Sequence, residues 1–281
     1  FVTARGWEDL SEILKSYEEL QVEIGEELIG EFLQKEEIAR DFAGYYRLYE
    51  KYKSDYQIQE ILDGNVTSGQ LKTCCDMGKK ASFEERFTVT EMLLEAVTER
   101  ISVFQKTDEK TEKLYRNLKL LKVFLQEKNS VEAMEQFIAS RRKALDAKIC
   151  SELLTAEEAA REEEQIRILE EYFFQLKELH ISDVAEGIEQ IGERFGNVCR
   201  LRNEKLEETK KMLEHAFSFL EECFGEGQEL LLFETGLTGD DRCSIFISQY
   251  GCPSYFKHCE LLLYSKKENE LRKECRDLLE E

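Results

Sequence analysis

The residues best placed for chemistry lie at the start of the chain, in the run F-V-T-A-R-G-W. Thr3 is a good helix N-cap, so we expect Arg5 in the first turn of a helix. Free backbone N–H groups and the positive end of the helix dipole favour an anion there. Trp7, the only tryptophan, would anchor this helix start. A cation in this position is typical of a phosphate-sensing site, although a lone arginine is more often a solvated surface residue.

A second group of potential ligands lies near the end of the chain and is the only metal-like cluster in the sequence. Its spacings match no zinc knuckle or ribbon. Two members are adjacent on an expected helix, where neighbouring side chains point about 100° apart. Buried thiols therefore explain the cluster better than a structural metal does. The cluster consists of Cys243, Cys252, His258, Cys259 and Cys275.

The other residues that could take part in catalysis are isolated. His180 and His215 stand alone on expected helices, and no glutamate lies three residues before any histidine, as a helical di-metal site requires. Cys74 and Cys75 are adjacent and lack the C-x-x-C spacing of a redox pair. Nine cysteines without the spacing of a small disulfide scaffold predict reduced, mostly buried thiols. A free-standing hydrolase or di-iron enzyme is not expected.

Two stretches near the N-terminus carry a family resemblance. Phe1–Ser11 and Glu31–Tyr52, about the first quarter of the chain, resemble the helical lid subdomain of AAA+ ATPases of the MoxR type. In that family a segment of small residues, an arginine and aromatic residues opens a lid helix. Its arginine is the sensor-2 residue, which reaches the γ-phosphate of ATP, and Arg5 matches that position. The segment Phe224–Leu263 looks like the C-terminal extension that some members carry.

The resemblance also implies an assembly and partners. It implies a homo-oligomeric, hexameric parent, a von Willebrand A-type partner protein and a role in the maturation of complexes. ATP and Mg²⁺ would be bound by the full-length parent. The lid would sense the nucleotide, and the helical extension would bind a substrate or a partner protein.

The chain departs from the family because the phosphate-binding core is absent from these 281 residues. Neither a G-x-x-x-x-G-K-[ST] loop (Walker A) nor an apolar strand ending in Asp-Glu (Walker B) occurs. We therefore expect a C-terminal fragment that binds no cofactor and hydrolyses no ATP by itself. The alternative is an ATP-independent helical scaffold protein whose heptad repeats serve oligomerisation.

Composition narrows the class of protein further. The net charge of −21 opposes binding to nucleic acids and to anionic membranes. Hydrophobic residues make up 42% of the chain, enough for a real core, and a single proline favours long helices. No run of 18 apolar residues and no signal peptide occurs, which predicts a cytoplasmic protein.

Hydrophobic periodicity predicts an all-α fold that begins with a three-helix, lid-like bundle over residues 1–64. Its helices are expected over 7–21, 26–34 and 36–62, with a turn at Asp63–Asn65. The first helix should bury one line of apolar side chains, and the third should pack through a line of mostly aromatic side chains. The two lines are Trp7, Leu10, Leu14 and Tyr17, then Ile38, Phe42, Tyr45, Tyr49, Tyr52 and Tyr56.

Residues 65–281 are predicted to form an elongated extension of long antiparallel, coiled-coil-like helices. A heptad pattern runs from Ser82 to Leu125, and the polar stretch 105–113 within it fits either a kinked helix or two helices. Further helices should begin at Asn129, at Thr155 and after Ser182. The acidic run 157–165 is expected to be a solvated first turn rather than a docking patch.

The end of the extension is less regular. Gly187, Gly192 and Gly196 lie inside an expected helix, which suggests the close approach of another helix or a kink. Residues 230–233 fit a buried strand or a helix, and the lack of a partner strand favours a helix. A short helix after Pro253 and a charged helix over 266–280 complete the prediction.

Overall fold

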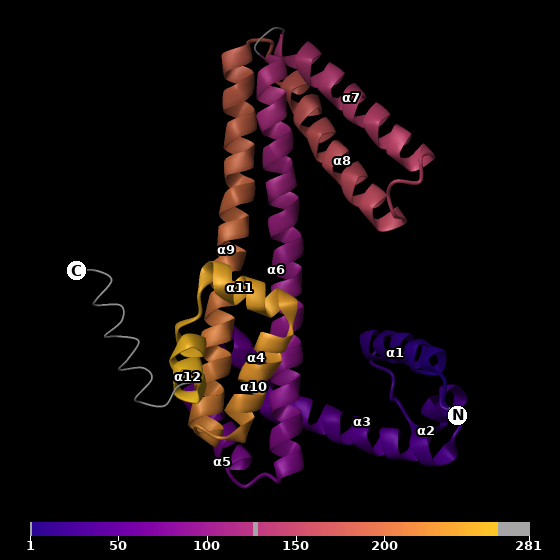
Figure 1. Ribbon diagram of the computed structural model, residues 1–281, viewed down its shortest axis with the longest axis vertical. Coiled ribbons are helices and arrows are strands. Elements are labelled where there is room, and N and C mark those ends of the chain that lie inside the picture. Colours follow the sequence, from indigo (N-terminus) through magenta and orange to yellow (C-terminus); the bar gives the residue numbers. More distant parts are fainter. Residues whose placement is uncertain (1, 126–128, 264–281) are drawn as a thin grey trace, which may run out of the picture. The chain divides into compact units, whose positions relative to one another are not determined.

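The computed structural model describes residues 2–125 and 129–263, with side chains up to residue 258 (Figure 1). Every regular element in these ranges is an α-helix, which confirms the predicted all-α class. The helix expected over 266–280 lies outside the described residues. The helices are α1 (Ala4–Glu19), α2 (Glu26–Phe32), α3 (Glu36–Tyr56), α4 (Ile58–Asp63), α5 (Ser68–Gly78), α6 (Phe83–Leu125), α7 (Ser130–Cys150), α8 (Ala156–Glu178), α9 (Val184–Phe224), α10 (Gln228–Gly239), α11 (Asp241–Tyr250) and α12 (Pro253–Leu263).

The helices group into two compact units. Among the described residues, unit 1 contains 2–97, 212–244 and 251–263. Unit 2 contains residues 98–125, 129–211 and 245–250. The long helices α6 and α9 contribute residues to both units. The expected boundary between a lid at 1–64 and an extension at 65–281 stays a prediction.

Within unit 1, α1, α2 and α3 enclose a small apolar core. Thr3 caps α1 as predicted, accepting a hydrogen bond from the Gly6 amide at 3.1 Å. The helix expected over 36–62 is divided at Gln57, whose left-handed φ of 50° ends α3 before α4 begins. The predicted turn is present, with Gly64 at φ 70°. The core consists of Leu10, Leu14, Ile29, Leu33, Ala39, Ala43 and Tyr46.

The buried faces of this bundle differ from the predicted lines of side chains. Trp7 is 39% exposed and Tyr45 is 49% exposed, so the expectation that both are buried is wrong. On α3 the buried positions in the first half are Ala39, Ala43 and Tyr46. Small alanine side chains let helix backbones approach closely, whereas the aromatic periodicity marks only where large apolar groups lie.

The rest of unit 1 packs around the end of α9. Phe217 contacts Phe233 of α10 edge-on, with ring centroids 5.2 Å apart. Gly236 of α10 lies so close to Leu94 of α6 that a Cβ there would overlap the leucine side chain. Residues 228–250 form α10 and α11, so the choice of helix over strand is confirmed.

In unit 2, α6 continues without interruption through the polar stretch 105–113. Several of these polar residues have partners on neighbouring helices, so the helix continues without a break. Asp108 receives a hydrogen bond from Arg202 Nε of α9 at 2.7 Å, and Lys110 and Lys113 form ion pairs with Glu164 and Glu162 of α8. Part of the acidic run 157–165 therefore pairs with α6 rather than being only solvated.

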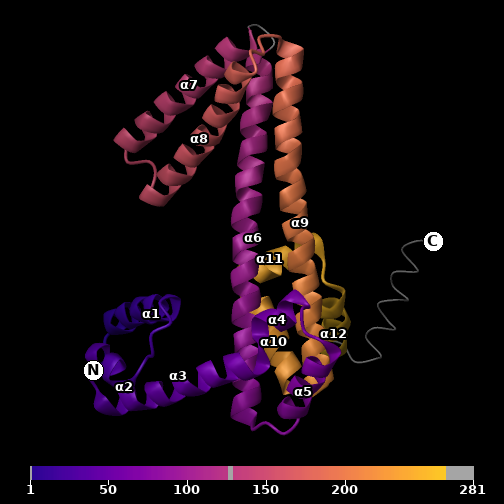
Figure 2. The same cartoon turned by 180° about the vertical axis from the view of Figure 1, so that it is seen from behind.

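The hairpin of α7 and α8 completes unit 2, and its two helices lie side by side in both views (Figures 1 and 2). The predicted starts are confirmed: Asn129 caps α7, and Thr155 forms a capping box with Glu158 on α8. Near the start of α9, Gly187 lies against Ser130, which confirms the predicted close approach at that glycine. No described helix is both long and apolar enough to cross a lipid bilayer.

Candidate functional site

Arg5 lies in the first turn of α1, as its position in the sequence predicts. Its side chain is 87% exposed, and it forms an ion pair with Asp9, one turn along the helix, with 3.8 Å between Arg5 Nε and the carboxylate. Exposed i,i+4 pairs contribute a few tenths of a kcal/mol. The first turn of α1 carries no acidic residue. The guanidinium can therefore leave Asp9 at little cost and bind an anion at the helix start.

Aromatic side chains of α3 support this helix start. Trp7 packs edge-on against Phe42, with ring centroids 5.2 Å apart and planes at 74°. The ring centroid of Phe42 in turn lies 6.4 Å from those of Tyr45 and Tyr46. The Tyr46 hydroxyl donates to Glu18 Oε1 at 2.9 Å, which links α3 to the far end of α1. Burial and this carboxylate raise the pKa of Tyr46, so its hydroxyl stays a donor at neutral pH. The contacts hold α1 on α3 and leave Arg5 outside.

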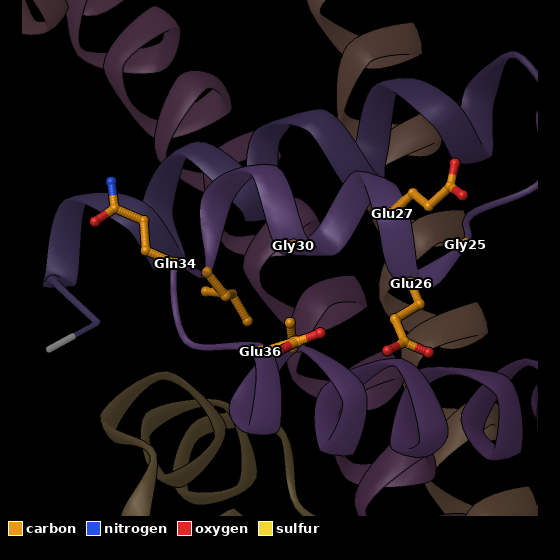
Figure 3. A pocket seen from close by; sticks show the side chains of 8 residues that line it. Gly25, Glu26, Glu27, Gly30, Gln34 and Glu36 are labelled. Carbon is orange, nitrogen blue, oxygen red and sulfur yellow. The ribbon is translucent and has the colours of Figure 1, made fainter.

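A cavity of about 780 Å³ lies between α2 and α3 in the same bundle (Figure 3). Figure 3 shows the carboxylates of Glu26 and Glu36 at this cavity, and both contact Arg40, at 3.4 and 4.0 Å. Its charged lining consists of glutamates. Such a lining disfavours phosphate, so this cavity is a poor site for a nucleotide.

The C-terminal cysteine and histidine cluster does not form a metal site in the described part of the chain. Cys243 and Cys252 are buried, which confirms the interpretation as buried thiols for these two. Burial raises the pKa of Cys252 to about 12, so it stays a neutral thiol rather than a thiolate ligand. His258 Nε2 contacts the Glu221 carboxylate. The side chain of Cys259 and all of Cys275 lie outside the described residues.

The two other histidines, His215 and His180, have structural rather than catalytic positions. His215 Nδ1 lies 2.9 Å from the Leu62 carbonyl oxygen and packs under Gly64, where a Cβ would overlap its ring. His180 follows the end of α8 with a left-handed φ of 54°. Neither histidine forms a hydrogen bond or ion pair with a carboxylate or a nucleophile among the described residues.

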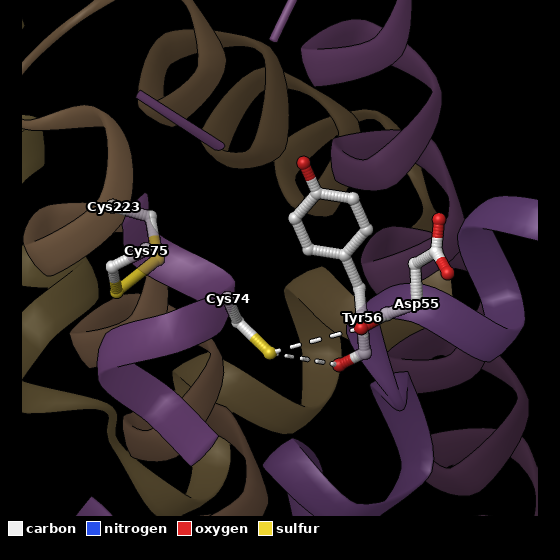
Figure 4. The surroundings of a disulfide bond; sticks show 5 residues. All are labelled: Asp55, Tyr56, Cys74, Cys75 and Cys223. Carbon is white, nitrogen blue, oxygen red and sulfur yellow. Dashed lines mark hydrogen bonds between the residues drawn. A yellow bond between two sulfur atoms is a disulfide. The ribbon is translucent and has the colours of Figure 1, made fainter. Parts of the chain in front are cut away.

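The structure pairs two cysteines that sequence reasoning left apart. Cys75 of α5 and Cys223 of α9 form a disulfide, with Cα atoms 4.3 Å apart (Figure 4). The expectation of reduced thiols is wrong for this pair. A separation of 148 residues makes such a pairing invisible to spacing arguments. Figure 4 shows Cys74, on the same helix, turned away from the disulfide and towards the Tyr56 carbonyl.

Glu234 is a buried residue that the sequence did not single out. It is 2% exposed, and neither carboxylate oxygen has a hydrogen-bond partner among the described residues. Burial raises its pKa, and His258 offsets part of that shift. The signal in the sequence is a glutamate directly after the apolar run 230–233, on the face that packs inward.

Comparison of the chain with protein-family models, with curated proteins and with solved structures found no match. The assignment of a function therefore depends on the residues and geometry described above.

Proposed function

We propose that this chain is the nucleotide-sensing lid and partner-binding helical part of a MoxR-type AAA+ ATPase. The observation that carries the proposal is Arg5, an exposed cation in a helix turn that has no acidic residue. Its position matches the sensor-2 arginine of the resemblance described above. In this function α1 to α3 respond to ATP, and the long helices engage a substrate or partner.

ATP and Mg²⁺ would be held mainly by a phosphate-loop core that these 281 residues do not include. Arg5 would add one cationic contact to the γ-phosphate. A contact made only with the triphosphate couples the position of the lid to the state of the nucleotide, because a ligand shifts a conformational equilibrium only through differential binding. The parent is proposed to be a homo-oligomer with a von Willebrand A-type partner.

The test is ATP hydrolysis by the protein in which this chain follows its nucleotide-binding core. Arg5→Ala should lower turnover by roughly one to three orders of magnitude, the effect of removing one donor to the transition state. Lys15→Ala, an exposed cation on the same helix, is the matched control and should leave turnover unchanged. Normal turnover in the Arg5→Ala protein would contradict the sensor assignment.

A cytoplasmic location belongs to the same proposal. The cytosol keeps thiols reduced, so the Cys75–Cys223 pair can test the location. Cells are quenched with acid to prevent thiol exchange, the protein is unfolded in the presence of an alkylating agent because both cysteines are buried, and the peptides are then mapped by mass spectrometry. A cytoplasmic protein should yield both cysteines alkylated, and a fully disulfide-linked peptide pair would point to an oxidising compartment.

The second candidate function is an ATP-independent helical scaffold. It is favoured by α6 and α9, which run for 43 and 41 residues and are longer than most helices of globular proteins. A scaffold should self-associate without nucleotide, and Arg5→Ala should have no effect on it. Sedimentation of the chain over a range of concentrations, with and without ATP, separates the two functions.

A further inference from the structure

The second half of α6 has an outer surface of unusual composition. Successive helical residues point 100° apart, so seven exposed residues of this segment share one continuous arc. Four of them are large apolar side chains between 45% and 63% exposed. The other three are basic. In order around the helix the arc consists of Lys122, Tyr115, Lys119, Val123, Arg116, Leu120 and Phe124.

The charge of this arc is opposite to that of the whole chain. Residues 113–125 contain four basic residues and no acidic one, whereas the chain carries −21. Lys119 and Lys122 form no ion pair with any described residue, and Arg116 pairs only within its own helix, with Glu112 at 2.5 Å. The positive charge of the arc is therefore largely unneutralised within the described part of the chain.

Contacts of the two outer aromatic residues fix the edges of the arc. Tyr115 stacks on Phe195 of α9, with ring centroids 5.9 Å apart. Phe124 contacts Phe137 of α7 edge-on at 5.4 Å. The surface is thus held by packing on both sides, and Leu120 and Val123 lie between these edges. Leu120, Val123 and Phe124 are neighbours on the helix surface, and exposed apolar side chains grouped in this way and bordered by charges favour an interaction site.

We propose that this arc of α6 binds an acidic amphipathic helix of a partner protein. Leu120, Val123 and Phe124 have the i, i+3, i+4 spacing through which one helix packs on another. Lys119 and Lys122 border them and complement Asp and Glu side chains of the incoming helix. The inference deepens the partner-binding part of the proposed function, and in that sense rests on it, but it makes no use of Arg5.

A direct binding measurement on the full chain tests this proposal. The probe is a fluorescein-labelled, helix-stabilised peptide of about five turns, with leucine on one face and glutamate on the other, titrated by fluorescence anisotropy. Binding should weaken at least tenfold in the Lys119→Glu/Lys122→Glu protein and in the Val123→Ser protein. It should also weaken as salt rises, because the charges are exposed.

Matched controls distinguish an effect of this surface on peptide binding from a general effect of changed charge or hydrophobicity. Lys79→Glu/Lys80→Glu makes the same charge change on exposed residues after α5, and Val103→Ser removes an exposed valine elsewhere on α6. Both proteins should bind the peptide normally, and circular dichroism should show that every variant is folded. A peptide with lysine in place of glutamate should bind at least tenfold more weakly.

Four outcomes would overturn the proposal. They are absence of peptide binding, equal binding by the variants and the wild-type protein, preference for vesicles of anionic lipid over the peptide, and self-association of the chain through these residues. The Arg5 experiment is independent, because Lys119→Glu/Lys122→Glu should preserve Arg5-dependent hydrolysis. Failure of peptide binding with an intact Arg5 effect rejects this surface alone, whereas failure of the Arg5 test leaves the binding result standing.

Discussion

Two buried glutamates on α10 differ in their polar contacts, because within the described part of the chain one forms an ion pair and the other does not. Glu229 is 5% exposed and forms an ion pair with Arg86 Nε of α6 at 3.2 Å. Glu234, little more than one turn later, is similarly buried, and its carboxylate oxygens have no hydrogen-bond partner among the described residues. An unpaired buried charge destabilises the fold, while a buried pair is costly to break. The two residues therefore provide a matched comparison within one helix.

Glu234→Met should stabilise the protein at pH 8, by about 1–3 kcal/mol, because it removes a buried group without a partner. The pKa of Glu234 is raised above its ordinary value of 4.5, so the folded chain binds this proton more tightly than the unfolded chain. The contribution of Glu234 to the stability of the wild-type protein is therefore most favourable below pH 4.5 and falls as the pH rises through the folded-state pKa. Urea unfolding at pH 4 and pH 8 should show the advantage of methionine shrinking at pH 4.

Glu229→Met is the control and should destabilise the protein at pH 8, because it leaves Arg86 without its partner. Equal destabilisation by both substitutions would show that Glu234 has a compensating partner. The buried-charge interpretation would then be wrong.

At the scale of single elements, Gly187 and Gly192 of α9 allow the effect of side-chain packing on stability to be measured separately from the effect of helix propensity. A Cβ at Gly187 would lie 2.8 Å from Ser130 Cβ of α7, closer than real Cβ contacts. At Gly192 a Cβ would meet nothing within 4 Å. The same Gly→Ala change thus faces a tight interface at one site and open space at the other, within about one and a half turns of one helix.

Gly187→Ala should destabilise the protein by about 1–3 kcal/mol, because α7 must shift to admit the methyl group. Gly192→Ala should stabilise it by up to about 1 kcal/mol through better helix propensity. Chemical denaturation followed by circular dichroism measures both changes. Stabilisation by Gly187→Ala would mean that α7 and α9 do not approach closely at Ser130.

At the scale of the whole molecule, the chain leaves unit 1 along α6 and returns to it along α9. The Cys75–Cys223 disulfide joins the segments of unit 1 on either side of this excursion. All of residues 98–211, the main part of unit 2, lies between the two cysteines. A cross-link that closes such a long loop restricts the unfolded chain strongly.

Loss of this disulfide should lower the free energy of unfolding by about 2–5 kcal/mol. Cys223→Ser, or a reductant added to the wild-type protein, should produce this loss, measured by urea unfolding. Cys150→Ser changes an exposed thiol outside the pair and should have no effect. An unchanged midpoint on reduction would contradict a stabilising role for the bond.

The sequence by itself determined the features that depend on residues a few positions apart. The all-α class follows from hydrophobic periodicity, and the starts of α1, α7 and α8 follow from Thr3, Asn129 and Thr155. A cap is recognisable because its side chain bonds an amide two or three residues along. The place of Arg5 in the first turn of α1 was predictable for the same reason.

The tertiary structure alone decided the features that depend on residues far apart in the chain. It buries Ala39 and leaves Tyr45 half exposed, it joins Cys75 to Cys223, and it leaves the Glu234 carboxylate without a hydrogen-bond partner among the described residues. The polar stretch of α6 looked like a break because its partners on α8 and α9 lie about 50 to 95 residues away. Periodicity shows that a face is apolar, but contacts between distant segments decide which neighbour covers it.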